Sequence, residues 1–169
     1  MSSITCKFGG TSLADANCFR KVKSIILSNP ERRFVVPSAP GKRSPDDKKI
    51  TDLLYAWHTL AAQGLDASQP RSIIVERFLQ LAQELQLKTD VHALMKRIDE
   101  ESGKYAEPDY MASRGEYVNG ILLAEFLGAE FIDPAECIRF DEEGLLDPES
   151  YTLLGRRLTG DGLYVVPGF

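Results

Sequence analysis

The sequence has 169 residues, of which 43% are hydrophobic and 27% charged, as in an ordinary globular protein with a sizeable core. Its formal net charge of −5 argues against general nucleic-acid binding, and no apolar run approaches the ~18 residues that a membrane helix requires. The three cysteines are widely spaced and there are only two histidines, which argues against a metal site. The N-terminus is unlike a signal peptide, so we expect a cytoplasmic protein with reduced thiols.

The first part of the chain predicts a βαβ unit. A short apolar strand over residues 4–8 runs into two glycines, and a helix follows over residues 13–28, which Ser12 would cap. The apolar run Phe34-Val35-Val36, within residues 33–37, is typical of a buried strand of a parallel sheet. Strand, helix and strand in this order favour a right-handed crossover between parallel strands.

The middle of the chain carries helical patterns without a strand, so we expect a helical insertion on one side of the sheet. The later elements return to the sheet. We predict four helices in this insertion and its continuation, over residues 53–63, 72–87, 89–102 and 108–127. Thr51 or Asp52 would cap the first of them, and Thr89 or Asp90 the third. After them we predict a strand over 129–133, a turn over 134–137, a strand over 138–140, a helix over 147–158 that starts at Asp147-Pro148, and a strand over 163–166.

The loop after the first strand is a candidate phosphate-binding site. Gly9 and Gly10 would let an anion approach the backbone closely, and amides at the start of the next helix would favour its negative charge. Lys7 adds a full positive charge at the end of the strand, and the Thr11-Ser12 pair opens the helix that follows. The segment is neither a Walker A loop nor a Gly-x-Gly-x-x-Gly fingerprint, and an ordinary strand-to-helix turn with a solvated lysine remains the alternative.

The loop Ser38-Ala39-Pro40-Gly41 follows the second strand. Ligands of open α/β sheets bind at the carboxyl ends of the strands, where both glycine-containing loops are expected. The alternative is a plain surface loop. The charges that follow it favour a solvated face, because the acidic residues offset the basic ones; they are Lys42, Arg43, Asp46, Asp47, Lys48 and Lys49.

The segment Ser113-Arg114-Gly115-Glu116 opens the apolar part of a predicted helix. A glycine there costs about 1 kcal/mol relative to alanine, which indicates a close backbone approach or a bend. Glu116 would either form a surface ion pair with Arg114 or face the ligand cleft. In the cleft, its carboxylate would hold a substrate ammonium group or pair with Lys7.

Five segments occur in a fixed order along the whole chain. They are Lys7-Phe8-Gly9-Gly10-Thr11-Ser12, Val35-Val36-Pro37-Ser38-Ala39, Lys49-Ile50-Thr51-Asp52-Leu53-Leu54, Ser113-Arg114-Gly115-Glu116 and Pro167-Gly168-Phe169. Each is weak alone, but in this order and spacing they resemble the aspartate kinases of the amino-acid kinase superfamily. The resemblance implies a doubly wound αβα sandwich with a mostly parallel sheet.

The resemblance also implies a reaction, the ATP-dependent phosphorylation of the β-carboxylate of L-aspartate to 4-phospho-L-aspartate, which begins lysine, threonine and methionine biosynthesis. Lys7 resembles the catalytic lysine that stabilises charge on the transferred phosphoryl group. The phosphate loop would comprise Gly9, Gly10, Thr11 and Ser12. The aspartate contacts would be Ser38, Thr51, Glu116 and Phe169, with Glu116 binding the α-ammonium group. Mg²⁺ would be bound through the ATP phosphates, without a dedicated carboxylate cage.

Aspartate kinases continue beyond the segment that Phe169 ends. We therefore expect residues 1–169 to be the N-terminal part of a catalytic domain, without the nucleotide-binding half and the ACT-type regulatory domains, and inactive alone. An uncovered sheet edge would favour self-association. Two alternatives remain, a superfamily member that phosphorylates another carboxylate or a carbamate, and a truncated, non-catalytic interaction module.

Overall fold

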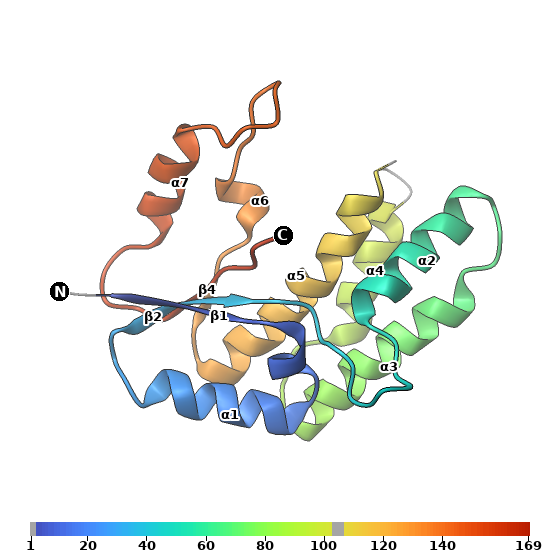
Figure 1. Cartoon of the computed structure of the whole chain (residues 1–169), viewed down its shortest axis with the longest axis horizontal. Helices are drawn as coiled ribbons and strands as arrows, with labels where there is room; N and C mark the ends of the chain where they lie inside the picture. Colours follow the sequence, from blue (N-terminus) through green and yellow to red (C-terminus); the bar gives the residue numbers. More distant parts are fainter. Residues whose placement is uncertain (1–2, 103–106) are drawn as a thin grey trace.

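A parallel sheet of four short strands lies at the centre of the molecule (Figure 1). The computed structural model describes residues 3–102 and 107–169. The strands lie in the order β1-β2-β4-β3, and every neighbouring pair is parallel. Their bounds are Ile4–Phe8 (β1), Arg32–Pro37 (β2), Glu130–Phe131 (β3) and Tyr164–Val165 (β4). The predicted α/β class with a parallel sheet is confirmed, although β3 and β4 are shorter than expected.

Helices cover both faces of the sheet, and a helical insertion extends to one side (Figure 1). In Figure 1, α1 lies below the sheet, α6 and α7 lie above it, and α2, α3 and α4 gather at the right around the start of α5. The helices are η1 (Gly10–Leu13, a 3₁₀ turn), α1 (Ala16–Leu27), α2 (Ile50–Ala62), α3 (Ser68–Glu84), α4 (Val91–Ser102), α5 (Pro108–Leu127), α6 (Pro134–Cys137) and α7 (Glu149–Arg157). The expected helical insertion is therefore present.

The strands divide the core into two parts, because successive side chains point to opposite faces. Val35 and Val165 belong to the larger apolar cluster, which α1 to α5 complete. Phe34 and Tyr164 point to the other face, where their rings stack at 5.9 Å between centroids and pack with α7 residues. This two-sided burial explains the continuous apolar run that predicted β2.

The start of α1 differs from the prediction. A 3₁₀ turn over Gly10–Leu13 intervenes, and α1 begins at Ala16. Its cap is Asp15, whose carboxylate accepts a 2.8 Å hydrogen bond from the Cys18 amide, whereas Ser12 was predicted to cap this helix. Aspartate caps at least as well as serine, and the turn also brings Leu13 into the core at 0% exposure.

The start of α2 also differs from the prediction. Lys49 is its cap residue, so Thr51 and Asp52 lie in its first turn instead of capping it. The helix starts early because Ile50, completely buried, is its first core residue. Of the two candidates for capping α4, Asp90 is confirmed, since its carboxylate accepts a 2.9 Å bond from the Ala93 amide.

The segment after β3 contains two further corrections. Residues 134–137 form a short helix instead of a turn, and residues 138–140 form no strand beyond a single bridge between Phe140 and Leu146. The Ser150 hydroxyl accepts a 2.8 Å bond from the Arg139 amide, so α7 satisfies this backbone in place of a neighbouring strand. Pro148 is the cap residue of α7 rather than its first helical residue.

Across residues 3–102 and 107–169, every helix is too short or too polar to cross a bilayer.

Candidate functional site

The loops that follow β1 and β2 touch each other through their backbones. The Ser38 amide donates to the Phe8 carbonyl at 2.9 Å, and the Gly41 amide donates to the Gly10 carbonyl at 2.8 Å. A Cβ atom on Gly41 would lie 2.6 Å from the Gly10 carbonyl carbon and 2.8 Å from the Thr11 nitrogen. Glycine at position 41 is therefore required by a close approach of two backbones.

A cleft of about 520 Å³ lies where these loops meet the start of α2. Four of the residues predicted from the sequence line it, namely Gly10, Thr11, Ser38 and Thr51. The remaining lining includes Lys42, Lys49 and Asp52. The carboxyl ends of β1 and β2 thus form one site, as expected for a parallel sheet.

Two backbone amides in the lining are available to a ligand. The 3₁₀ turn begins with a 2.9 Å bond from the Ser12 amide to the Gly9 carbonyl. Within the described part of the chain, the amides of Gly10 and Thr11 donate to no protein oxygen. A side chain on Gly9 would meet no atom within 4 Å, so the space beside this residue is open. Unpaired amides beside a glycine form an anion-binding concavity.

Lys7 and Ser12 lie outside this lining. Lys7 is exposed on β1, opposite Val36 in the strand register. Within residues 3–102 and 107–169, its ammonium group forms no hydrogen bond or ion pair, so the proposed pairing with Glu116 is not formed. Ser12 lines a separate hollow with Phe8 and Cys18.

Glu116 reaches the loop after β2 from α5. The Ser38 hydroxyl donates to its Oε1 at 3.2 Å, and the Gly168 amide donates to its Oε2 at 3.2 Å. The helix comes this close because Gly115 has no side chain; a Cβ atom there would lie 3.0 Å from Ala39 Cβ. The predicted close backbone approach at Gly115 is confirmed, and Ser38, Glu116 and the segment after β4 meet in space.

Asn119 is a site residue that the sequence reasoning missed. It lies one turn after Glu116 on the same face of α5, and its Nδ2 donates to the Ser38 carbonyl at 2.7 Å. Asn119 is completely buried, and within the described residues its Oδ1 accepts no hydrogen bond. A polar residue in the most apolar stretch of a predicted buried helix was the available signal.

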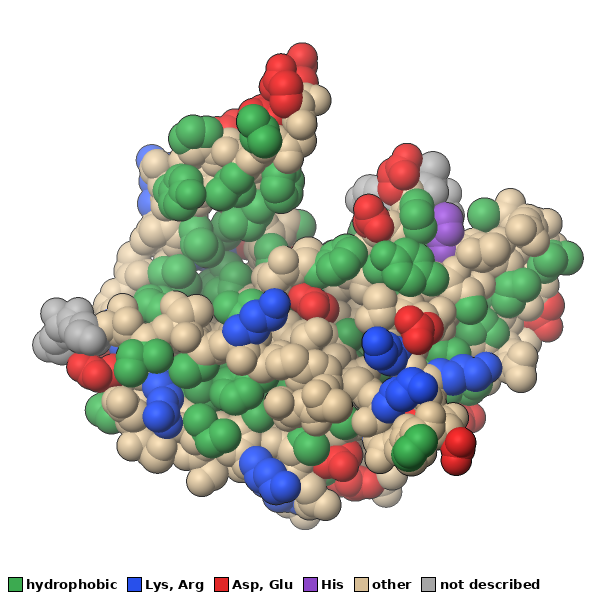
Figure 2. All heavy atoms as spheres, viewed as in Figure 1, with side chains coloured by type: hydrophobic (Ala, Val, Ile, Leu, Met, Phe, Trp, Pro, Cys, Tyr) green, Lys and Arg blue, Asp and Glu red, His purple; other side chains and the backbone are tan. Residues whose placement is uncertain are grey.

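Phe169 lines a second pocket, of about 330 Å³, between α5 and α6. Its ring is half-exposed, and the adjacent Gly168 contacts both this pocket and Glu116. The Arg114 guanidinium lies over the rings of Tyr110 and Tyr117, at 4.5 and 4.7 Å from their centroids. The space-filling view shows the molecule hollowed between the α6–α7 lobe and the helices at the right (Figure 2).

The surface ion pair considered for Glu116 is absent from the described residues, where Arg114 is occupied by its aromatic contacts. Burial raises the pKa of the Tyr117 hydroxyl, so this ring stays neutral at physiological pH. Arg114 and Tyr117 therefore shape one wall of the Phe169 pocket, while the Glu116 carboxylate remains directed at Ser38.

Comparisons with known proteins agree on one family. The sequence profile of the Amino acid kinase family matches residues 4–169. Aspartokinase 3 of Bacillus subtilis is 35% identical over 180 aligned residues, covering 96% of this chain and 39% of the relative.

Solved structures give the same result. The crystal structure of Clostridium acetobutylicum aspartate kinase is 41% identical and superposes on all of this chain with a TM-score of 0.94, over 39% of its own length. E. coli aspartokinase III in complex with aspartate and ADP, at 23% identity, shares the fold over 99% of this chain and 41% of its own, with a TM-score of 0.81. This chain thus spans about two fifths of the length of its relatives.

Proposed function

This chain belongs to the amino acid kinase family, and on that premise we propose that it supplies the acceptor side of an active site that phosphorylates L-aspartate on its β-carboxylate with ATP. The relatives that match along the whole chain are aspartate kinases, which supports aspartate over another acceptor. The product, 4-phospho-L-aspartate, would lead to lysine, threonine and methionine.

One observation carries the proposal: Glu116 is held beside Ser38 and Gly168 at the edge of the cleft. A carboxylate has about four acceptor positions, and these two hydrogen bonds leave others for the α-ammonium group of the substrate. The Thr51 hydroxyl would donate to a substrate carboxylate, whereas the Ser38 hydroxyl donates its single proton to Glu116 and would offer only its oxygen, as an acceptor for the ammonium group. Phe169 would close the neighbouring apolar pocket, which Gly168 connects to Glu116.

The phosphate end of the reaction would lie at the first glycine loop. The free amides of Gly10 and Thr11 would bind phosphate oxygens, and the open space beside Gly9 would admit them. Lys7 has a flexible stem and no partner among the described residues, so its ammonium group would swing to the phosphoryl group in transfer. We assign Ser12 a lesser role, because its side chain lines the hollow on the other side of the loop.

The reaction requires the protein to position the substrates and to neutralise charge, and it requires no general base. A β-carboxylate is ionised at neutral pH, so it attacks the γ-phosphorus without losing a proton first. Phosphoryl transfer depends on in-line placement and on neutralising the charge on the phosphoryl oxygens. Lys7 and the loop amides would provide that neutralisation.

Magnesium fits this site only as part of the nucleotide complex. The described residues contain no group of three or more acidic, histidine or cysteine side chains that could hold a metal, and Asp52 is the carboxylate in the cleft lining. Mg²⁺ is commonly held by substrate phosphates with one or two carboxylates. When bound, it would neutralise phosphate charge, and Asp52 would be its protein-side ligand.

The test is a coupled ADP-release assay on the full-length protein with L-aspartate, L-glutamate and carbamate as acceptors. Turnover with aspartate that Glu116→Gln reduces, and that exposed Glu76→Gln leaves unchanged, would support the proposal. Turnover with another acceptor alone would make the protein a different kinase of the family. A protein that binds neither ATP nor aspartate would be an interaction module instead.

A further inference from the structure

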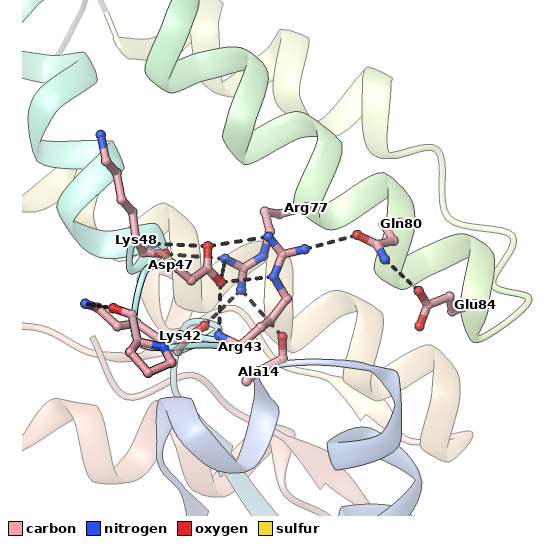
Figure 3. A network of polar contacts seen from close by, with 10 residues as sticks. Ala14, Lys42, Arg43, Asp47, Lys48, Arg77, Gln80 and Glu84 are labelled. Carbon is pink, nitrogen blue, oxygen red and sulfur yellow. Dashed lines mark hydrogen bonds and ion pairs between the residues drawn. The ribbon is translucent and has the colours of Figure 1, made fainter.

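Arg77 is a buried arginine that the proposed chemistry does not use. It lies on α3, in the helical insertion, and only 6% of its surface is exposed. Figure 3 shows its guanidinium group directed away from α3 toward Asp47 and the backbone near Ala14. Arginine is rarely buried so completely unless its charge is paired and its donors are used.

The guanidinium group of Arg77 joins the two loops of the cleft from behind. Nη2 donates to the Gly41 carbonyl at 2.9 Å and approaches the Ala14 carbonyl at 3.5 Å. Gly41 belongs to the loop after β2, and Ala14 follows the 3₁₀ turn that contains Gly10 and Thr11. One side chain from the insertion thus contacts the loop after β2 and also the residue that follows the turn with the proposed phosphate-binding amides.

Asp47 fixes the orientation of this guanidinium group. Arg77 Nη1 donates to Asp47 Oδ2 at 2.7 Å, and Arg43 Nε donates to the same oxygen at 3.0 Å (Figure 3). Arg43 in turn donates to Gln80, one turn after Arg77 on α3. Burial raises the pKa of Asp47, but hydrogen bonds from Arg43 and the charge of Arg77 outweigh it and lower the pKa to about 2.

Arg77 does not line the cleft, so any effect on chemistry must pass through the groups that it contacts, of which Gly41 is directly bonded to the first glycine loop. The Gly41 amide donates to the Gly10 carbonyl, and Gly10 lies directly before Thr11. The Arg77–Gly41–Gly10 series of hydrogen bonds therefore connects the insertion to the free amides. A planar guanidinium group with several donors can hold this geometry, whereas the single ammonium group of lysine cannot.

We propose that Arg77 is a positioning residue that sets the spacing of the two glycine loops and so aligns the Gly10 and Thr11 amides with the transferred phosphate. The inference rests on the proposed function, because alignment matters only if phosphate is transferred at this cleft. It assigns the helical insertion a part in the reaction, which its distance in sequence from the glycine loops does not suggest.

The experiment compares Arg77→Met, Arg77→Lys and Arg71→Met in the full-length protein. Arg71 is a matched control on the same helix, half-exposed and paired with Asp99 at 2.8 Å. We expect Arg77→Met to lower kcat by about 10- to 100-fold, because small misplacements of reacting groups cost that much, and to raise the KM for ATP more than the KM for aspartate. Compared with Arg77→Met, Arg77→Lys should recover more of the wild-type stability than of the wild-type kcat.

Amide hydrogen exchange gives a readout that is independent of activity. In Arg77→Met, the Gly41 amide should exchange at least about 10-fold faster, whereas the Ser38 amide, held by Phe8 in the strand ladder, should not change. Arg71→Met should change neither. Equal effects of Arg77→Met and Arg71→Met on both kcat and exchange would overturn the proposal.

Failure of the proposed function gives a different pattern. If the wild-type protein transfers no phosphate to aspartate, the proposed function is wrong, and with it the alignment role of Arg77. Faster exchange of Gly41 in Arg77→Met would then show a loop-ordering residue only. If wild type is active and Arg77→Met loses stability but keeps its kcat and its ATP KM, Arg77 has a structural role alone and the positioning inference is wrong.

Discussion

The Gly41 amide donates a 2.8 Å hydrogen bond to the Gly10 carbonyl, and this contact joins two loops that lie 31 residues apart in the sequence. Both glycines line the cleft that holds the proposed phosphate-binding amides. The contact depends on the absence of a side chain at position 41, which leads to the first prediction.

Gly41→Ala should destabilise the protein by about 2 kcal/mol or more, because the new Cβ would overlap backbone atoms that cannot rotate away. Gly155→Ala is the control, since a Cβ there meets no atom within 4 Å and alanine favours the helix. Urea unfolding of both variants measures the difference. Equal unfolding midpoints for Gly41→Ala and wild type would contradict the close approach.

Glu116→Gln should raise the KM for aspartate by about 10- to 100-fold, because a neutral amide loses a charge-assisted bond of about 1.5–3 kcal/mol to the substrate ammonium group. The KM for ATP should change little. Steady-state kinetics of the full-length protein measure both, with exposed Glu76→Gln as control. A larger effect on the KM for ATP than on the KM for aspartate would contradict the assignment of Glu116 to the aspartate-binding part of the site.

Lys7→Met should lower kcat by at least about 100-fold, as expected when a group that stabilises transition-state charge is removed. The KM for aspartate should stay within a factor of about three, and the fold should be retained because Lys7 is exposed. Lys21→Met, an exposed lysine at the hollow that Ser12 lines, is the control. Full activity in Lys7→Met would remove Lys7 from the catalytic machinery.

Asp47 should contribute to stability only above strongly acidic pH. Its pKa is lowered from 3.8 to about 2, so the contribution is complete above pH 4 and is lost as the pH falls to about 2. Its size is roughly 2 kcal/mol, at 1.36 kcal/mol per pKa unit. Urea unfolding between pH 2 and pH 5 should show a shallower dependence for Asp47→Asn than for wild type, whereas Asp46→Asn, at an exposed neighbour, should follow wild type.

This chain should self-associate in solution. β1 lies at the end of the strand order, and Ile25 and Leu27 on the adjacent α1 are 46% and 57% exposed. An uncovered edge strand next to exposed apolar side chains favours pairing with another copy. Sedimentation velocity should show a concentration-dependent shift that Ile25→Lys reduces, and a single monomeric species at high concentration would contradict this expectation.

Patterns within short stretches of sequence correctly predicted the strands and helix ends that depend on nearby residues alone. The apolar run of β2 follows from burial on both faces, the strand β1 from its half-buried alternate residues Ile4, Cys6 and Phe8, and the Gly128 end of α5 from a left-handed cap. The prediction of a cap at Ser12 was wrong because several polar residues near a helix start can compete, and Asp15 forms the bond to Cys18. The strand predicted over residues 138–140 was wrong because Ser150 of α7 satisfies the Arg139 amide.

The sequence by itself determined the family, the two glycine loops and the residue types that suit phosphate and an amino-acid substrate, because ordered motifs and glycine positions are local properties. Only the tertiary structure decided which of these residues meet. It placed Glu116 against Ser38 and Gly168, left Lys7 exposed and outside the cleft lining, and brought the buried Arg77 behind Gly41. Those contacts join segments 36 to 78 residues apart, and the packing of helices on the sheet sets such distances.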